Sequence, residues 1–298
     1  NDNDSMFSIK EKFYTRVLDI ISNLMKNILK PYNIVNIVMY GSQASGLSLP
    51  ESDIDILIFY KEPKYCTKIL LKELYYAFSE NKIFKNVIQL PNASIPLIKL
   101  EYPIKINNID ITLLHMDISF SNLYPNKNVN FNPSLMIINY MRSSLEYLPQ
   151  CKCIILILKK YLKNLGLKNY YSGGLSSFSI FLLVFAFYKY IIKEFGHDEV
   201  TDYYVGQFFI QFLTFYSEFN FQKWIININK DIPFIYRDEY YNNIFSNDLV
   251  VIIDPFSRNN IASGSFKISE IQEKFKNLKE NLKINFEEKI IRNPKIYY

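Results

Sequence analysis

The chain has 298 residues, of which 49% are hydrophobic and 16% aromatic, so it can bury one large core or two moderate ones. Its net charge of +5 permits a polyanionic partner but is too small to identify one. Three cysteines without a CxxC pair argue against a zinc knuckle or a disulfide framework. The most apolar stretch, 178–188, is shorter than the ~20 residues of a membrane span. We expect an intracellular protein of two domains, nuclear or cytoplasmic, with no membrane partner.

Helical and strand patterns alternate in the first half of the chain. Helical spacing of apolar residues predicts a helix over 7–29, ended by Pro31, and a second helix over 67–78. The predicted strands lie at about 34–40, 53–60 and 83–90, followed by a hairpin with arms at 95–106 and 109–120. The hairpin turn is assigned to Asn107-Asn108, a pair that tolerates a left-handed backbone.

Helical patterns dominate the second half. The polar, Asn-rich segment 123–131 is the expected crossing between domains. Helices are predicted from Asn132-Pro133, over about 149–165, 175–195 and 201–218, and near the end, where Ser269 and Gln272 form a capping box. A short strand is expected at 250–253. The predicted fold class is therefore α+β, a small domain with a mixed sheet followed by a mostly helical domain.

Asp53 and Asp55 are the most informative residues. They interrupt an apolar strand, where charge is costly unless a metal or a partner compensates it. Two carboxylates at i and i+2 of a strand share one face, about 6.6 Å apart, which suits a pair of divalent ions. Gly41-Ser42, at the end of the preceding strand, offers backbone N–H groups and a hydroxyl to a phosphate. The combination indicates an enzyme that transfers a nucleotide.

A third carboxylate is needed to position the nucleophile, and Asp110 and Asp117 compete for that role. Symmetric pairing of the hairpin places Asp110 beside the turn and Asp117 in the middle of the sheet, opposite Ile98–Lys99. An Asp beside a turn has an ordinary explanation. Asp117 is therefore the preferred third carboxylate.

Three weaker features lie in the helical half, and each also has an ordinary structural explanation. Lys159 and Lys163 share one helix face, whereas Lys160 faces away. The Gly-rich turn 172–178 could hold phosphate through Ser177 and present the Phe178 ring to a base. The side chains of Asn259 and Asn260 could read a base edge after the turn at 254–256. The histidines, His115 and His197, are treated as structural or surface residues.

Taken in order, these residues resemble the noncanonical poly(A) polymerases and terminal uridylyltransferases of the DNA-polymerase-β-like nucleotidyltransferase superfamily. The resemblance runs from about Phe7 to Phe275. Its motifs are Gly41-Ser42 with Asp53-x-Asp55, 95–99 leading to 117–120, the Lys159…Lys163 helix, 173–178, and 254–256 with Asn259-Asn260. The first motif is shared across the superfamily, whereas the whole series in order is specific.

The resemblance implies a catalytic domain over 32–125 and a helical central domain made of 6–30 and 126–298, with the nucleotide in the cleft between them. The residues that match the carboxylates holding two Mg²⁺ ions, for which Mn²⁺ can substitute, are Asp53, Asp55 and Asp117. Those that match the triphosphate contacts are Gly41, Ser42, Lys159, Lys163 and Ser177. Phe178 matches the ring stacked on the base, and Asn132 falls near a ribose-contacting Asn, although helix capping before Pro133 explains Asn132 equally well.

The implied activity is template-independent addition of AMP from ATP to an RNA 3′ end. Uridylyl members of the family commonly carry a His two positions before the residue matched by Ile261, and here that position is Asn259. The pattern of 259–261 and 264–266 looks more like that of adenylyl-transferring members. A terminal uridylyltransferase using UTP is the alternative with the same chemistry.

Two alternatives come from other classes. A catalytically silent scaffold that binds RNA or protein would be expected to lose Asp53 or Asp55, and both are present. Transfer to a small molecule fits poorly with the long helical half. Since the sequence contains no RNA-recognition motif, RNA is expected to be held along the cleft or delivered by an RNA-binding partner protein.

Overall fold

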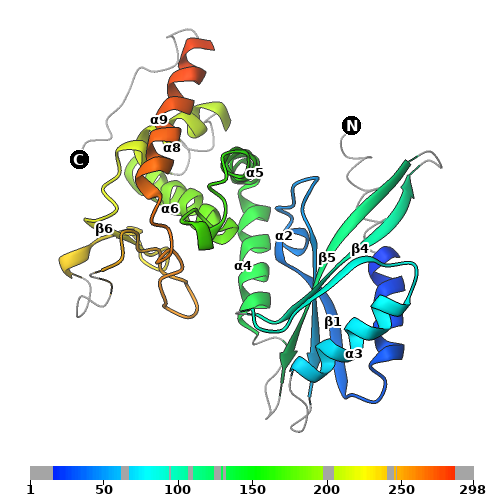
Figure 1. Cartoon of the computed structure of the whole chain (residues 1–298). Coiled ribbons are helices and arrows are strands. Elements are labelled where there is room, and N and C mark those ends of the chain that lie inside the picture. Colours follow the sequence, from blue (N-terminus) through cyan, green and yellow to red (C-terminus); the bar gives the residue numbers. More distant parts are fainter. Residues whose placement is uncertain are drawn as a thin grey trace. The chain divides into compact units, whose positions relative to one another are not determined.

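The computed structural model describes residues 16–61, 67–93, 95–106, 110–123, 129, 132–196, 205–239, 245 and 247–285. The chain forms two compact units, Asn1–Arg142 and Ser143–Tyr298. Figure 1 shows the first as a sheet with helices and the second as mostly helical. The predicted α+β class is confirmed.

A five-stranded mixed sheet, in the order β1-β2-β5-β4-β3, forms the frame of the first unit. Its strands are β1 (Ile34–Tyr40), β2 (Ile54–Tyr60), β3 (Lys85–Leu90), β4 (Leu97–Ile106) and β5 (Asp110–Asn122). Only the β2–β5 pair is parallel among these neighbours. The predicted strands and hairpin are confirmed, and the expected Asn107-Asn108 turn lies outside the described residues.

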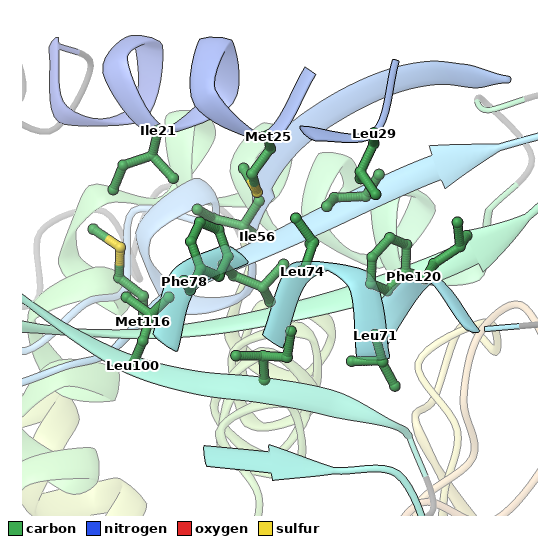
Figure 2. Close-up of a cluster of buried hydrophobic side chains, with 14 of the residues drawn as sticks. Ile21, Met25, Leu29, Ile56, Leu71, Leu74, Phe78, Leu100, Met116 and Phe120 are labelled. Carbon is green, nitrogen blue, oxygen red and sulfur yellow. The ribbon is translucent and has the colours of Figure 1, made fainter. Parts of the chain in front are cut away.

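One face of this sheet carries the main core. The N-terminal helix (described over 16–28) and α3 (Thr67–Glu80) cover it, as Figure 1 shows. Ile21, Met25 and Leu29 are spaced four residues apart, and Figure 2 shows them above Ile56 of β2 and Phe78 of α3. All five side chains are fully buried.

This packing differs from the expected domain division. The family resemblance implied that residues 6–30 join the helical domain, but the described part of that helix packs on the sheet. Its apolar stripe fills the sheet face that Ile54, Ile56 and Ile58 present. The division between the units also falls later, after Arg142 and within α4 (Pro133–Tyr147), rather than at about 125.

The second unit confirms the predicted helices. They are α5 (Pro149–Asn164), α6 (Ser177–Phe195), α8 (Val205–Glu218) and α9 (Ile268–Asn285), with short 3₁₀ turns at Tyr170–Ser172 and Arg237–Glu239. The hairpin of β6 (Trp224–Ile226) and β7 (Phe234–Tyr236) was not predicted. In place of the strand expected at 250–253, Ile252 and Ile253 form only isolated bridges to Ile226 and Asn260.

The capping box predicted for the last helix is not formed. Because α9 begins at Ile268, Ser269 already lies inside its first turn. The Gln272 side chain instead donates hydrogen bonds to the backbone oxygens of Tyr216 (2.9 Å) and Phe219 (2.8 Å). These carbonyls lie at the end of α8, so Gln272 satisfies orphan acceptors there and joins the two helices.

No helix in the described ranges is long and apolar enough to cross a membrane.

Candidate active site

Strand register brings a row of polar side chains together in the first unit. Asp55 of β2 pairs with Asp117 of parallel β5, and Asp117 pairs with Lys99 of β4. On the other side of Asp55, its partner on β1 is Tyr40. Residues paired across neighbouring strands have Cβ atoms about 5 Å apart and point to the same face. Two carboxylates, a lysine and a tyrosine therefore form one row across four strands.

The same register separates the two candidates for the third carboxylate. Asp110 pairs with Ile106 at the far end of the hairpin. It lies seven residues from Asp117, about 23 Å along the strand. The predicted placement of Asp117 opposite Lys99 is confirmed, and Asp110 lies too far from Asp55 to share an ion with it.

Alternation along β2 sets which face carries the carboxylates. Ile54, Ile56 and Ile58 are buried in the main core. Asp55 is partly buried on the opposite face, which Leu57 and Phe59 share farther along the strand. Asp53 precedes the strand and is exposed.

Asp55 carries the strongest electrostatic strain in the row. Burial, followed by the charges of Asp117 and Asp53, raises the pKa of Asp55 to about 7. A hydrogen bond from the Ser42 backbone N–H and the charge of Lys99 act in the opposite direction and lower this pKa. The carboxylates thus lie close enough to repel one another, and a bound cation would relieve that repulsion.

Lys99 and Ser119 are site residues that sequence reasoning gave no role. The Lys99 Nζ lies 2.5 Å from the Asp117 Oδ2, and Ser119 Oγ is hydrogen-bonded to the Tyr40 hydroxyl at 3.1 Å. Burial chiefly raises the Tyr40 pKa, and the Asp55 and Asp117 charges add to the rise. Hairpin pairing, already used to place Asp117, was the signal that could have identified Lys99.

The Gly41-Ser42 turn packs directly on Asp55. Gly41 begins a single helical turn, α2 (Gly41–Ala44), with φ of +67°. A Cβ at Gly41 would lie 2.0 Å from Asp55 Oδ2, so only glycine fits. The neighbouring Gln43 Nε2 is buried and has no hydrogen-bond partner in the described part of the chain. Beside the carboxylates, this turn therefore holds amide donors of the kind that bind phosphate.

The donor set suits a hard divalent cation, because Mg²⁺ is bound through carboxylate oxygens. Asp53 lies immediately before β2, Asp55 lies in β2, and Asp117 is the register partner of Asp55. Among the described residues, however, no group of three or more acidic, His or Cys side chains already has the spacing of a metal site. In this row, Asp117 is paired with Lys99.

Lys159 and Lys163 of the second unit differ in burial. Lys159 on α5 is fully buried, whereas Lys160 and Lys163 are exposed. Their joint action on a phosphate remains a prediction.

The two serines at the start of α6 have different roles. Ser176, rather than Ser177, is the N-cap, because its Oγ accepts from the Ser179 backbone N–H at 3.0 Å. Ser177 is the first helical residue and is partly exposed. The partly exposed Phe178 ring stacks on Phe181 at 6.2 Å between centroids. A base contact by Phe178 stays a prediction.

Asn259 and Asn260 also have different surroundings. Asn260 Oδ1 accepts from the backbone N–H groups of Ile252 (3.0 Å) and Ala262 (2.9 Å). Its Nδ2 donates to Asp248 Oδ2 and Val250 O, both at 2.8 Å. The Asn260 amide is thus fully used within its own loop, whereas Asn259 is exposed. Of the two predicted base-reading residues, Asn259 is the better placed.

The Gly-rich turn owes its glycines to packing. A Cβ at Gly173 would lie 2.6 Å from the Phe266 ring, and one at Gly174 would lie 2.1 Å from Leu167 O. Lys267 N–H donates to Gly173 O (3.0 Å), and Ser265 Oγ donates to Gly174 O (2.9 Å). The turn is therefore joined to the segment that follows Asn259-Asn260, so two motifs about 90 residues apart form one structural element.

Asn132 acts as a helix cap. Its Oδ1 accepts from the backbone N–H groups of Ser134 (3.0 Å) and Leu135 (3.4 Å), and its Nδ2 donates to Ser121 Oγ at 3.2 Å. These contacts match the capping explanation, and the ribose contact stays a prediction.

Two family models match separate segments of the chain. The central palm domain of mitochondrial-like poly(A) RNA polymerases matches residues 2–130, and the Cid1 family poly(A) polymerase model matches residues 204–260. Over these two segments the chain is similar to the noncanonical poly(A) polymerases. The palm match covers the Gly41-Ser42 turn and the three predicted carboxylates, and the second match covers Asn259 and Asn260.

The curated relatives of this chain are longer than the chain itself. Poly(A) RNA polymerase protein 1 of Eremothecium gossypii is 29% identical over 246 residues, which is 80% of this chain but 37% of that protein. The inactive noncanonical poly(A) RNA polymerase protein Trf4-2 of Drosophila melanogaster is 24% identical over 67% of this chain and 46% of its own length. The chain thus spans less than half the length of both.

A solved structure has a similar fold. The Cid1 poly(U) polymerase with Mg and 3′-dATP bound has a TM-score of 0.70 and 20% sequence identity, covering 92% of this chain and 88% of that one.

Proposed function

We propose that the chain is a template-independent RNA 3′-terminal nucleotidyltransferase that adds AMP from ATP. The observation that carries this proposal is the pairing of Asp55 with Asp117 on adjacent parallel strands, with the Gly41-Ser42 turn packed on Asp55. Phosphoryl transfer is catalysed largely by positioning and by charge stabilisation. A carboxylate row beside an amide-rich turn can supply both.

Asp53, Asp55 and Asp117 would hold two Mg²⁺ ions, and Mn²⁺ could replace them. Bound there, the ions supply charge that balances the attacking and leaving oxygens. Asp117 would face the RNA 3′-hydroxyl and take its proton. The Ser42 hydroxyl and the amides that follow Gly41 would bind the leaving pyrophosphate.

The second unit would complete the nucleotide site. Lys159, Lys163 and Ser177 would contact the triphosphate, and Phe178 would stack on the base. Asn259, which is exposed, would select the base by a hydrogen bond to its edge.

ATP is the proposed substrate because Asn259 stands where uridylyl members of the family commonly carry His. Terminal uridylyl transfer from UTP is the second candidate, because the Cid1 poly(U) polymerase has a similar fold. The two activities use the same carboxylates and differ only in base selection.

A silent scaffold is the candidate from another class, and the relative Trf4-2 is an inactive noncanonical poly(A) RNA polymerase. The raised pKa of Asp55 supports a catalytically active chain rather than a silent scaffold. A chain released from catalysis would gain stability by replacing one of the mutually repelling carboxylates.

A direct assay tests the proposal. The purified chain is incubated with a labelled oligoribonucleotide, Mg²⁺ and each nucleoside triphosphate in turn, beside the Asp53→Ala variant. We expect extension by the wild type, most with ATP, and none by the variant, while circular dichroism shows the variant folded. Substantial residual extension by Asp53→Ala would reject the metal assignment, and no extension by either protein would favour the scaffold.

RNA would lie along the active face or be delivered by an RNA-binding partner protein. We place the activity inside the cell, in the nucleus or cytoplasm, in keeping with the free thiols of Cys151 and Cys153.

A further inference from the structure

The Lys99 ammonium group contacts Asp117, the predicted third carboxylate, at an oxygen that could bind a cation. Its Nζ donates to Asp117 Oδ2 at 2.5 Å, so the two groups form a direct, hydrogen-bonded ion pair. The Lys99 side chain is 44% exposed and that of Asp117 is 17% exposed. The ammonium group therefore approaches a largely covered carboxylate from the solvent side, and its flexible stem can withdraw without disturbing the strand.

The surrounding charge explains why Lys99 is drawn to this position. Asp53 and Asp117 both act on Asp55 in the sense that disfavours its charge, and Lys99 acts in the opposite sense. One lysine thus offsets part of the repulsion within a group of three carboxylates. A divalent ion in the same place would carry twice its charge and bind the same oxygens.

We propose that Lys99 is a positioning residue that occupies the cation position on Asp117 in the metal-free protein, and that it turns to the acceptor RNA when a divalent ion is bound. The inference deepens the proposed function and rests on it. Lys99 and the ion compete for the same carboxylate oxygen, so the lysine weakens metal binding in the absence of RNA.

The in-line geometry of phosphoryl transfer indicates where the Lys99 ammonium group would lie once it leaves Asp117. The Gly41-Ser42 turn, the proposed pyrophosphate site, follows β1 at one edge of the sheet. The attacking and leaving oxygens lie on opposite sides of the phosphorus. The acceptor strand must therefore approach over β5 and β4, and Lys99 is on β4. Its exposed ammonium group can then bind a phosphate of the RNA near the 3′ end.

Two measurements with opposite expected signs test this assignment. Binding of Mn²⁺ alone to the metal-free protein is followed by the loss of the free-ion electron paramagnetic resonance signal. Lys99→Met should bind Mn²⁺ roughly three- to tenfold more tightly than the wild type, since the competing ammonium group is gone. Fluorescence anisotropy with a labelled oligoribonucleotide and Mn²⁺ should show RNA binding weakened by a similar factor. If Lys99 had only a structural role, Lys99→Met would weaken both Mn²⁺ binding and RNA binding.

Lys68→Met is the matched control. The Lys68 Nζ donates to the neutral Asn92 side chain at 3.2 Å on the same unit, so the variant removes one positive charge without freeing a carboxylate. It should leave Mn²⁺ affinity unchanged. Lys99→Arg keeps the charge and should restore RNA binding without tightening Mn²⁺ binding.

The outcomes separate this inference from the proposed function. Unchanged or weaker Mn²⁺ binding by Lys99→Met, with binding abolished in Asp53→Ala, would overturn the Lys99 assignment alone. Equal Mn²⁺ binding by Asp53→Ala and the wild type would reject the carboxylate metal site, and the Lys99 assignment would fall with it. Thermal unfolding without metal confirms that each variant is folded.

Discussion

Asp55 and Asp117 are direct register partners on parallel strands, with no residue between them to separate their charges. Like charges placed opposite each other destabilise a sheet. The cost appears in the pKa of Asp55, which burial and the two neighbouring carboxylates raise to about 7. Strongly shifted groups of this kind are common at functional sites. The pair thus links the stability of the first unit to its chemistry.

The metal-free protein should lose stability as the pH rises from about 4 to about 7. In this window the folded state keeps the Asp55 proton, whereas the unfolded chain, with a pKa near 3.8, has released it. Asp55→Asn should remove this loss and raise the free energy of unfolding near pH 8 by about 1–3 kcal/mol. Urea unfolding in a chelator, at about pH 5 and about pH 8, measures both effects. Asp19→Asn, on the exposed side of the N-terminal helix, is the control.

Gly41→Ala should stop nucleotide addition and lower the free energy of unfolding by about 2–4 kcal/mol, because the new methyl group would overlap the Asp55 carboxylate. Gly166→Ala separates this clash from backbone strain. Gly166 has nearly the same φ, +69°, but nothing lies within 4 Å of its Cβ position. It should cost only about 1 kcal/mol. Equal losses in the two variants, measured by urea unfolding, would contradict the close packing of Gly41 on Asp55.

Asp117→Asn should reduce nucleotide addition at least about a hundredfold, since the amide keeps the shape but not the charge of the third carboxylate. Asp110→Asn should stay near the wild-type rate, because Asp110 pairs with Ile106 at the far end of the hairpin. Single-turnover extension of a labelled oligoribonucleotide compares the two. A larger loss in Asp110→Asn would reverse the assignment.

Asn260→Ala should destabilise the second unit by about 2–4 kcal/mol, since it removes the hydrogen bonds to Ile252, Ala262, Asp248 and Val250. Asn259→Ala, at an exposed position, should change stability by less than about 0.5 kcal/mol.

Asn259→His should raise the use of UTP relative to ATP, because Asn259 is the proposed base-selecting residue. Competition assays with both triphosphates measure the ratio. An unchanged ratio would show that the base is selected elsewhere.

The predicted nucleotide-binding residues of the second unit differ in ways that the sequence does not reveal. Spacing placed Lys159 and Lys163 on one helix face, but burial separates them, because the core covers only part of that face. Asn259 and Asn260 are neighbours of the same type, and only hydrogen bonding distinguishes them. Gly173 and Gly174 resembled a phosphate loop, yet their fit against Phe266 and Leu167 depends on contacts distant in sequence.

The sequence alone determined the strands of the first unit, most of the helices and the position of Asp117, because period-two alternation and symmetric hairpin pairing are local rules. Tertiary structure decided which face each element buries. The stripe of Ile21, Met25 and Leu29 could have packed on either domain, and the apolar face of the sheet selected it. Tertiary structure also placed Asp55 beside Asp117 and Lys99 on Asp117, since strand order across a sheet is set by packing between distant segments.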